Sequence, residues 1–291
     1  MKNKLNGERK ALIAFLSLPL ILVILFGLIP IICLIYYSFT EWNGISQTKE
    51  IVYFDNYIKI LTSEKYLEVF KNCFYYLVSG LLQIIIGFIL ALILYSKTKF
   101  KGFFKGVFLF PVLISGVAIS MIFRVFFAPN GTLDGVLTLI GLEENIRYWL
   151  GDPKIVNWAL SFISLWRYTG MSFILYFCAM QSIPIEQFKV LEIEGGGVIQ
   201  KVFHVIIPNI KTSIKINFIM LFIGVVSVFD IPMIMTDGSN GTSTFLLKTM
   251  KVAFEDKEFG MASAMAVILS LILISIMIIR KTVVKGDKNE K

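Results

Sequence analysis

Six long stretches of apolar residues dominate this 291-residue chain. Each is about 20 residues or longer, the length that an α-helix needs to cross the hydrocarbon core of a membrane. The stretches cover residues 11–39, 69–95, 107–127, 155–180, 210–235 and 259–279. Because a helix satisfies its backbone hydrogen bonds internally, they predict an all-α integral membrane protein with six transmembrane helices.

The composition argues against other classes of protein. Hydrophobic residues make up 56% of the chain and charged residues 16%, whereas soluble domains are about 45–50% apolar and about 25% charged. A soluble enzyme of this size has too little interior to bury so much apolar surface. The high content of Phe, Tyr and Trp likewise argues against a disordered chain.

The distribution of Lys and Arg predicts the orientation in the membrane. Of the 28 basic residues, 17 fall in the N-terminal segment, the loops at 97–106 and 183–215, and the C-terminal tail, and 8 fall in the opposite loops. Basic residues concentrate on the cytoplasmic side, so both termini are predicted to be cytoplasmic. The net charge of +8 thus reports sidedness, and no nucleic acid partner is expected.

We divide the chain into an N-terminal part, residues 1–68, a core of five transmembrane helices, residues 69–281, and a cytoplasmic tail, residues 282–291.

The side chains that support enzymatic or metal chemistry are scarce. His204 is the only histidine, and the three cysteines are far apart. No carboxylate cluster or HExxH pattern occurs, which argues against an intramembrane enzyme and predicts no metal site.

The connection at residues 183–208 has the pattern of two short helices joined by a glycine turn. Pro184 can open the first helix, Gly195 to Gly197 interrupt it, and a second amphipathic stretch from Val198 to Ile207 is predicted to end at Pro208. Two interpretations remain open from the pattern alone. The hairpin either lies on the lipid surface or docks with a cytoplasmic partner.

This hairpin resembles the cytoplasmic loop of permease subunits of bacterial ABC importers of the carbohydrate and sn-glycerol-3-phosphate type. Their pattern is Glu-Ala-Ala, three residues, Gly, nine residues, then Ile-x-Leu-Pro. Gly195, Val205, Ile207 and Pro208 match its spacing, and the carbohydrate version is further matched by Ile183, Pro184, Glu186, Glu194 and Gln200. Lys189, Val190 and Leu191 replace the Glu-Ala-Ala.

Four other stretches are similar to these permeases in the same order, so that the resemblance spans nearly the whole chain. They are residues 54–61, 97–115, 229–247 and 259–269. In the third stretch, Asp237, Ser239 and Asn240 replace the usual glycines and proline.

The resemblance implies a multi-pass permease of the bacterial cell membrane that imports sugars, oligosaccharides or a glycerol-phosphate-like solute. It also implies three kinds of partner: a second permease, expected to be a paralogue; two cytoplasmic ATPase subunits; and an exterior solute-binding lipoprotein. The chain contains no GxxxxGK[ST] sequence, so ATP and Mg are expected on the ATPase subunits. Coupling to them is assigned to the hairpin residues Pro184, Glu186, Lys189, Glu192, Glu194, Gly195, Gly196, Gln200 and Pro208.

Charged residues inside the apolar stretches are the candidates for a substrate path, because ionisable groups at membrane depth usually face a cavity or a partner. Arg167 and Asp230 are such residues, and Trp166 offers an aromatic face for a sugar ring. Alternatively, Arg167 and Asp230 form a structural pair or cap a helix, and Arg124 snorkels to the surface. A secondary transporter or channel that works alone, and a regulatory subunit derived from a permease, also remain open.

Overall fold

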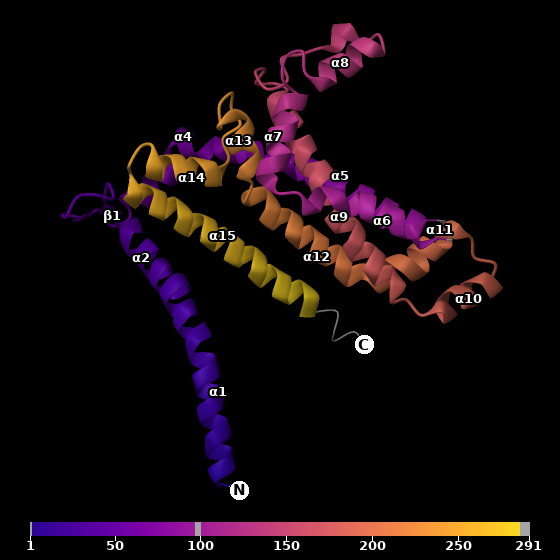
Figure 1. The fold of residues 1–291 in the computed structure, drawn as a ribbon, viewed down its shortest axis with the longest axis horizontal. Helices are drawn as coiled ribbons and strands as arrows, with labels where there is room; N and C mark the ends of the chain where they lie inside the picture. The colour runs from indigo at the N-terminus through magenta and orange to yellow at the C-terminus, as the bar shows by residue number, and fades with distance from the viewer. Residues whose placement is uncertain (1, 97–99, 286–291) are drawn as a thin grey trace. The chain divides into compact units, whose positions relative to one another are not determined.

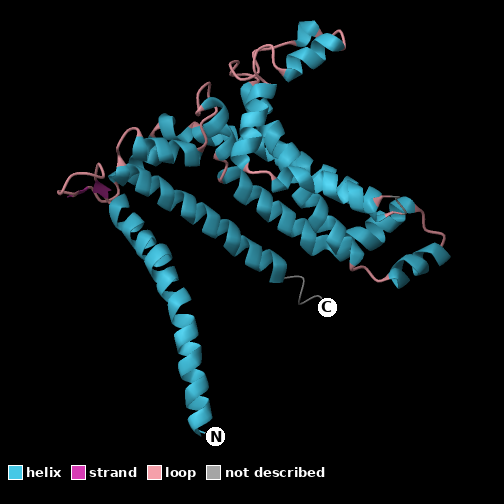
Figure 2. Cartoon of the chain, viewed as in Figure 1, coloured by secondary structure: helices cyan, strands magenta, loops and turns pink. Residues whose placement is uncertain are grey.

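The described part of the chain is built almost entirely from helices (Figure 2). This structure, a computed structural model, describes residues 2–96 and 100–285, with the side chains of residues 12–96 and 100–279. The strands among these residues are β1 (Thr40–Glu41) and β2 (Glu50–Ile51), which pair antiparallel with Thr40 opposite Ile51. The all-α prediction is therefore confirmed. Lys97, Lys99 and the end of the predicted tail, 286–291, lie outside the described residues.

The chain divides into two compact units. The first comprises Met1–Ser63 and Thr249–Ser270, and the second comprises Glu64–Lys248 and Leu271–Lys291. In the first unit, Asn56 donates to the carbonyls of Ser38 and Thr40, and Gly260 N–H donates to Trp42 O. Its helices are α1 (Lys2–Val23), the π-helix η1 (Ile24–Leu28), α2 (Ile29–Ser38) and α3 (Asp55–Thr62). Two helices contribute residues to both units, α14 (Phe245–Phe254) and α15 (Phe259–Lys285).

The second unit is organised around α9 (Val156–Gln181), which packs against α5 (Val69–Tyr95), α6 (Lys101–Leu113) and α12 (Ile207–Val226). Figure 1 shows these helices side by side. The remaining elements are shorter: α4 (Glu64–Leu67), α7 (Gly116–Phe126), α8 (Thr132–Leu139), η2 (Glu143–Asn145), α10 (Ile185–Ile193), α11 (Val198–Gln200), η3 (Lys201–Ile206) and α13 (Asp230–Thr236).

Four helical segments of the described residues are long and apolar enough to cross a membrane: Leu12–Ser38, Glu64–Tyr95, Val198–Thr236 and Phe259–Ile279. The third of these includes an interruption at residues 227–229. A bent pair, Lys101–Leu113 and Gly116–Phe126, is a fifth candidate. Helix α9, the predicted fourth span, is not among them, yet half of its 26 residues are buried. A helix enclosed by neighbouring helices can carry polar residues that lipid would not tolerate. The six-span topology thus stays a prediction.

The predicted single helix at residues 107–127 is wrong. The chain instead forms α6 and α7, bent by 93° across Ile114 and Ser115. Pro111 lies inside α6, ahead of the break. Ser115 is in an extended conformation, and its hydroxyl accepts from Ala118 N–H, so it caps the new helix α7.

The predicted end of the second hairpin helix at Pro208 is also wrong, because α11, η3 and α12 follow one another without a gap. Ahead of the proline the chain widens into a π-helix, in which Ile207 N–H bonds to Val202 O. The same arrangement precedes Pro30: η1 is a π-helix, and Ile29 N–H bonds to Ile24 O. A π-turn changes the hydrogen-bond register, so the helix passes a residue that has no N–H.

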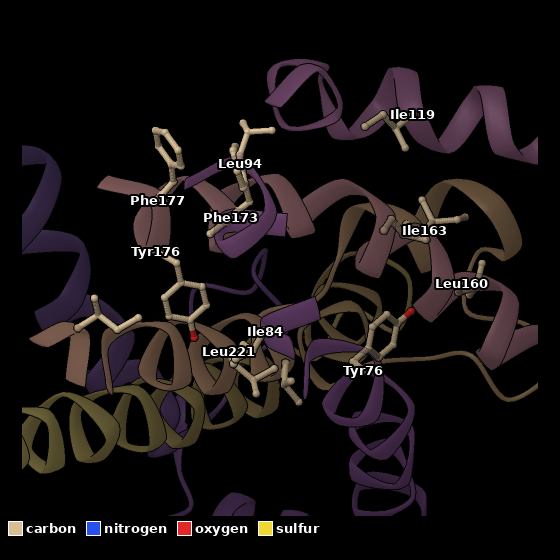
Figure 3. Packing of buried hydrophobic residues seen from close by; sticks show 14 of the residues in the cluster. Tyr76, Ile84, Leu94, Ile119, Leu160, Ile163, Phe173, Tyr176, Phe177 and Leu221 are labelled. Carbon is tan, nitrogen blue, oxygen red and sulfur yellow. The ribbon is translucent and has the colours of Figure 1, made fainter. Parts of the chain in front are cut away.

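The core of the second unit lies where α5 and α9 meet (Figure 3). Tyr76 and Ile84 from α5 and Phe173 and Tyr176 from α9 are buried there. Gly87 permits the close approach of the helices, since a Cβ at this position would lie 2.7 Å from Ser172 Cβ and 2.9 Å from Phe173 N. Backbone cannot move aside as a flexible side chain can, so this contact requires glycine.

We predict that Gly87→Ala lowers the unfolding temperature of the purified protein in detergent. Overpacking of this kind costs about 1–3 kcal/mol. Gly224→Ala in α12 is the matched control, because a Cβ there meets nothing within 4 Å. That variant should be neutral or more stable, as Ala is the better helix former. Equal unfolding temperatures for the two variants would contradict the close packing of α5 on α9.

Candidate functional site

Two interrupted helices meet at the side of α9. One interruption separates α6 from α7, and the other, residues 227–229, separates α12 from α13. Helix α13 packs against both α7 and α9. Interrupted helices leave backbone carbonyls and N–H groups without helical partners, so such a place is tolerated in a membrane protein only where other groups satisfy them.

Arg167 of α9 connects the two interruptions. Its Nη2 donates to Ile114 O, at the first break, over 3.5 Å, and its Nη1 lies 3.9 Å from Oδ2 of Asp230, the first residue of α13. The Arg167 side chain is 13% exposed and that of Asp230 is 49% exposed, while Arg167 Nε is buried without a partner. Both contacts are long, so the ion pair is loose and its groups retain capacity for other hydrogen bonds.

Gly116 makes room for this ion pair. It is the first residue of α7, and a Cβ on it would collide with Asp230 Oδ2 and lie 2.8 Å from Arg167 Nη1. No sequence signal marks Gly116 as part of the site, although Ser115 before it is a recognisable helix cap. The predicted residues Arg167 and Asp230 are thus brought together, and Gly116 and the carbonyl of Ile114 are additions from the structure.

Aromatic residues precede and follow Arg167 on α9. The Trp166 ring lies 5.4 Å from that of Phe123 on α7 and is 37% exposed, and the Arg167 guanidinium lies 5.0 Å from the ring of Tyr168. Arg124 is exposed and reaches Ile234 O of α13 over 3.5 Å. Chemically, the site offers a cation, a carboxylate and aromatic faces, but no three His, Cys, Asp or Glu side chains in the described residues group as metal ligands.

The second candidate site is the hairpin, and its turn has a defined geometry. Helix α10 ends at Ile193 and is capped by Glu194. Gly195 follows with φ of +78°, and the N–H groups of Gly195 and Gly196 bond to Glu192 O and Leu191 O. This is the Schellman arrangement, which needs a residue that adopts positive φ easily. Position 196 requires glycine for a different reason, because a Cβ there would collide with Leu191. Gln200 then accepts from Gly197 N–H and starts the next helix.

Side chains fix α10 to the helix that returns from the turn. Lys201 Nζ lies 2.7 Å from Glu192 Oε1, and Asn209 Nδ2 donates to Gln187 Oε1 over 2.6 Å. Phe188 packs against the buried core, with its ring 5.9 Å from that of Tyr95 at the end of α5. The hairpin is therefore attached to α5 and α12 and is not an independent flap.

Most of the predicted coupling residues are on the surface of this hairpin. Pro184 precedes α10, Pro208 lies in the first turn of α12, and the exposed polar members are Glu186, Lys189, Glu192, Glu194 and Gln200. Several apolar side chains near the turn are also exposed: Val190, Ile193, Val198 and Ile199. Ile193 is 87% exposed. The hairpin thus presents both charge and apolar surface.

The chain is similar to known proteins over nearly its full length. The family described as "Binding-protein-dependent transport system inner membrane component" matches residues 83–286. "Probable ABC transporter permease protein YurN" of Bacillus subtilis is 31% identical, and the match covers 98% of this chain and 99% of that protein. "Multiple sugar-binding transport system permease protein MsmF" of Streptococcus mutans is 31% identical, with 89% of this chain and 90% of that protein covered.

The fold also matches a solved structure. A chain of a bacterial alginate ABC transporter, in complex with a periplasmic protein that holds an alginate pentasaccharide, superposes with a TM-score of 0.80. The match covers 94% of each chain at 18% sequence identity. At this identity the likeness establishes the fold alone.

We predict that the effect of Gly116→Ala depends on Asp230. Alone, the added methyl group displaces Asp230 and Arg167 and should destabilise the protein by about 1–3 kcal/mol. In an Asp230→Ala background the colliding carboxylate is gone, so the same substitution should cost less. A double-mutant cycle on unfolding in detergent measures this coupling, which is about 0.5–3 kcal/mol for residues in contact. Purely additive effects would show that Gly116 and Asp230 are not in contact.

Proposed function

Because this chain belongs to the family of binding-protein-dependent transport system inner membrane components and is a permease subunit of an ABC importer, we propose that it passes sugars or oligosaccharides along a path that includes Trp166, Arg167 and Asp230. A glycerol-phosphate-like solute fits the same chemistry. The observation that carries the proposal is the loose Arg167–Asp230 ion pair, held where two interrupted helices meet.

The chemistry of this place suits a sugar. Sugar hydroxyl groups can donate to carboxylates and accept from guanidinium groups. Asp230 is half-exposed, and its Oδ2 lies 3.9 Å from Arg167 Nη1, so both groups retain capacity to bond to a sugar. The exposed face of Trp166 provides apolar surface for the ring carbons. A relative whose name includes "sugar-binding transport system" supports this substrate class. Transporters also commonly bind substrate where membrane helices are interrupted.

We assign coupling to the 183–208 hairpin. Its glycine turn and its exposed apolar residues fit insertion into a groove on a cytoplasmic ATPase subunit. The continuous run from α11 through η3 into α12 would carry a displacement of the turn along α12 towards the interruption before Asp230. A hairpin that merely lies on lipid would not need two side-chain ties to the returning helix.

We propose three kinds of partner. Two ATPase subunits bind ATP and Mg, since this chain has no P-loop sequence. A second permease, expected to be a paralogue, completes the pathway, and an exterior solute-binding lipoprotein delivers the solute. The alginate transporter was solved with its periplasmic protein, which supports the last of these. Membrane lipid surrounds the assembly. A transporter that works alone is not favoured, because the relatives are permease subunits of larger systems.

We predict that Asp230→Ala lowers ATP-driven sugar uptake in reconstituted vesicles about tenfold, the effect of losing one charge-assisted hydrogen bond to the solute. Copurification of the partner subunits should persist. Glu143→Ala removes an exposed carboxylate from η2 and is the control, with uptake unchanged. Loss of assembly in Asp230→Ala would instead assign the ion pair a structural role.

We predict that Gly195→Val abolishes copurification of the ATPase subunits while membrane insertion is retained. A β-branched residue strongly disfavours φ of +78°, so the turn must change its shape. Gly195→Asn is the matched control, because Asn tolerates this conformation and nothing lies within 4 Å of the added Cβ. Normal copurification of Gly195→Val would rule out the turn as the docking element.

A further inference from the structure

Two buried asparagines attach the loop that follows α13 to the helix core. Asn72 on α5 donates to Ser243 O over 2.7 Å, and Asn157 on α9 donates to Gly241 O over 3.0 Å. The Asn157 Nδ2 atom also lies 3.5 Å from Asn72 Oδ1. Since both backbone groups are acceptors, they fix the amide nitrogens of Asn72 and Asn157 towards the loop.

Three buried polar atoms near this attachment have no hydrogen-bond partner in the described structure: Asn157 Oδ1, Tyr76 Oη and Ser243 Oγ. Tyr76 follows Asn72 by four residues and therefore shares its face of α5. Figure 3 shows the Tyr76 hydroxyl directed towards the helix that carries Leu160, and Leu160 lies one turn after Asn157 on α9. Tyr76 and Asn157 are each only 3% exposed. The unpartnered atoms thus belong to residues gathered around one contact.

The chemistry of these atoms identifies what would bind between them. Asn157 Oδ1 needs a donor, the Tyr76 hydroxyl carries a proton that needs an acceptor, and Ser243 Oγ can do either. None of the three atoms has a hydrogen-bond partner among the described residues. A cation offers no acceptor to the tyrosine, and no carboxylate is among these atoms. Water both donates and accepts, and buried waters typically make about three hydrogen bonds.

We propose that an ordered water molecule binds between α5, α9 and the 241–243 loop, bridging Tyr76, Asn157 and Ser243. The water completes a polar contact that extends further. Thr244, the next residue, is buried and donates to Val228 O over 2.6 Å, in the interruption that precedes Asp230. The bound water therefore belongs to the group of buried polar contacts that holds the interruption before Asp230 in place. Its presence does not depend on which solute is carried.

X-ray radiolytic labelling of the full-length protein in its assembled complex tests this site. Radiolysis of a bound water produces a hydroxyl radical that modifies the adjacent side chain, even when bulk solvent cannot reach it. Tyr176 is the internal control: it is 1% exposed and in the same core, but its hydroxyl is hydrogen-bonded to Asn217. We expect Tyr76 to be modified several-fold faster than Tyr176. Equal slow rates would overturn the proposal.

A pair of variants separates a bound water from bulk solvent. Asn157→Leu removes an acceptor of the proposed site and should slow the modification of Tyr76 to the rate of Tyr176. Asn217→Leu alters a buried amide outside the proposed site and should leave the rate at Tyr76 unchanged. Should Asn157→Leu not assemble, Ser243→Ala provides the same comparison. Fast modification of Tyr76 that persists in the site variant would mean that bulk water reaches the residue, which contradicts the proposal.

Discussion

A guanidinium group inside a membrane protein must find acceptors, and an interrupted helix must find donors for its carbonyls. In this permease the two requirements meet at Arg167. The break between α6 and α7 leaves the carbonyl of Ile114 for Arg167, and the break before α13 supplies the carboxylate of Asp230. Gly116 keeps the space between them clear. Without the two breaks the Arg167 charge would lose both the Ile114 carbonyl and the Asp230 carboxylate, at a high cost in apolar surroundings.

The proposed coupling follows from how the Arg167–Asp230 site is connected to the hairpin. Helix α12 begins directly after η3, so that the glycine turn and the interruption at 227–229 are the two ends of one helical run. The π-segment keeps that run continuous across Pro208. In the proposed assembly this helix has one end on an ATPase subunit and the other beside Asp230, so that it can transmit movement between them. The loose ion pair is the contact that such a movement would alter first, because its contacts are the longest of the site.

The sequence predicts the long helices well, because their signal is local. The predicted span 69–95 coincides with α5, and 155–180 lies within one residue of α9 at each end. Arg167 and Asp230 could be selected as unusual charges, and the structure brings them together. It is tertiary geometry that the sequence does not reveal. Pro208 predicts a helix end locally, but a π-turn accommodates it. Only the cap residue Ser115 marks the break after α6 in the sequence.

The most direct test of the account is the accessibility of position 230 in the assembled transporter. Asp230→Cys is introduced after Cys33, Cys73 and Cys178 have been replaced, and its reaction with a membrane-impermeant thiol reagent is measured during ATP hydrolysis. The account predicts that the cysteine reacts and that the imported sugar protects it. A cysteine that never reacts, or one whose reaction rate the sugar leaves unchanged, would contradict a solute path through the Arg167–Asp230 site.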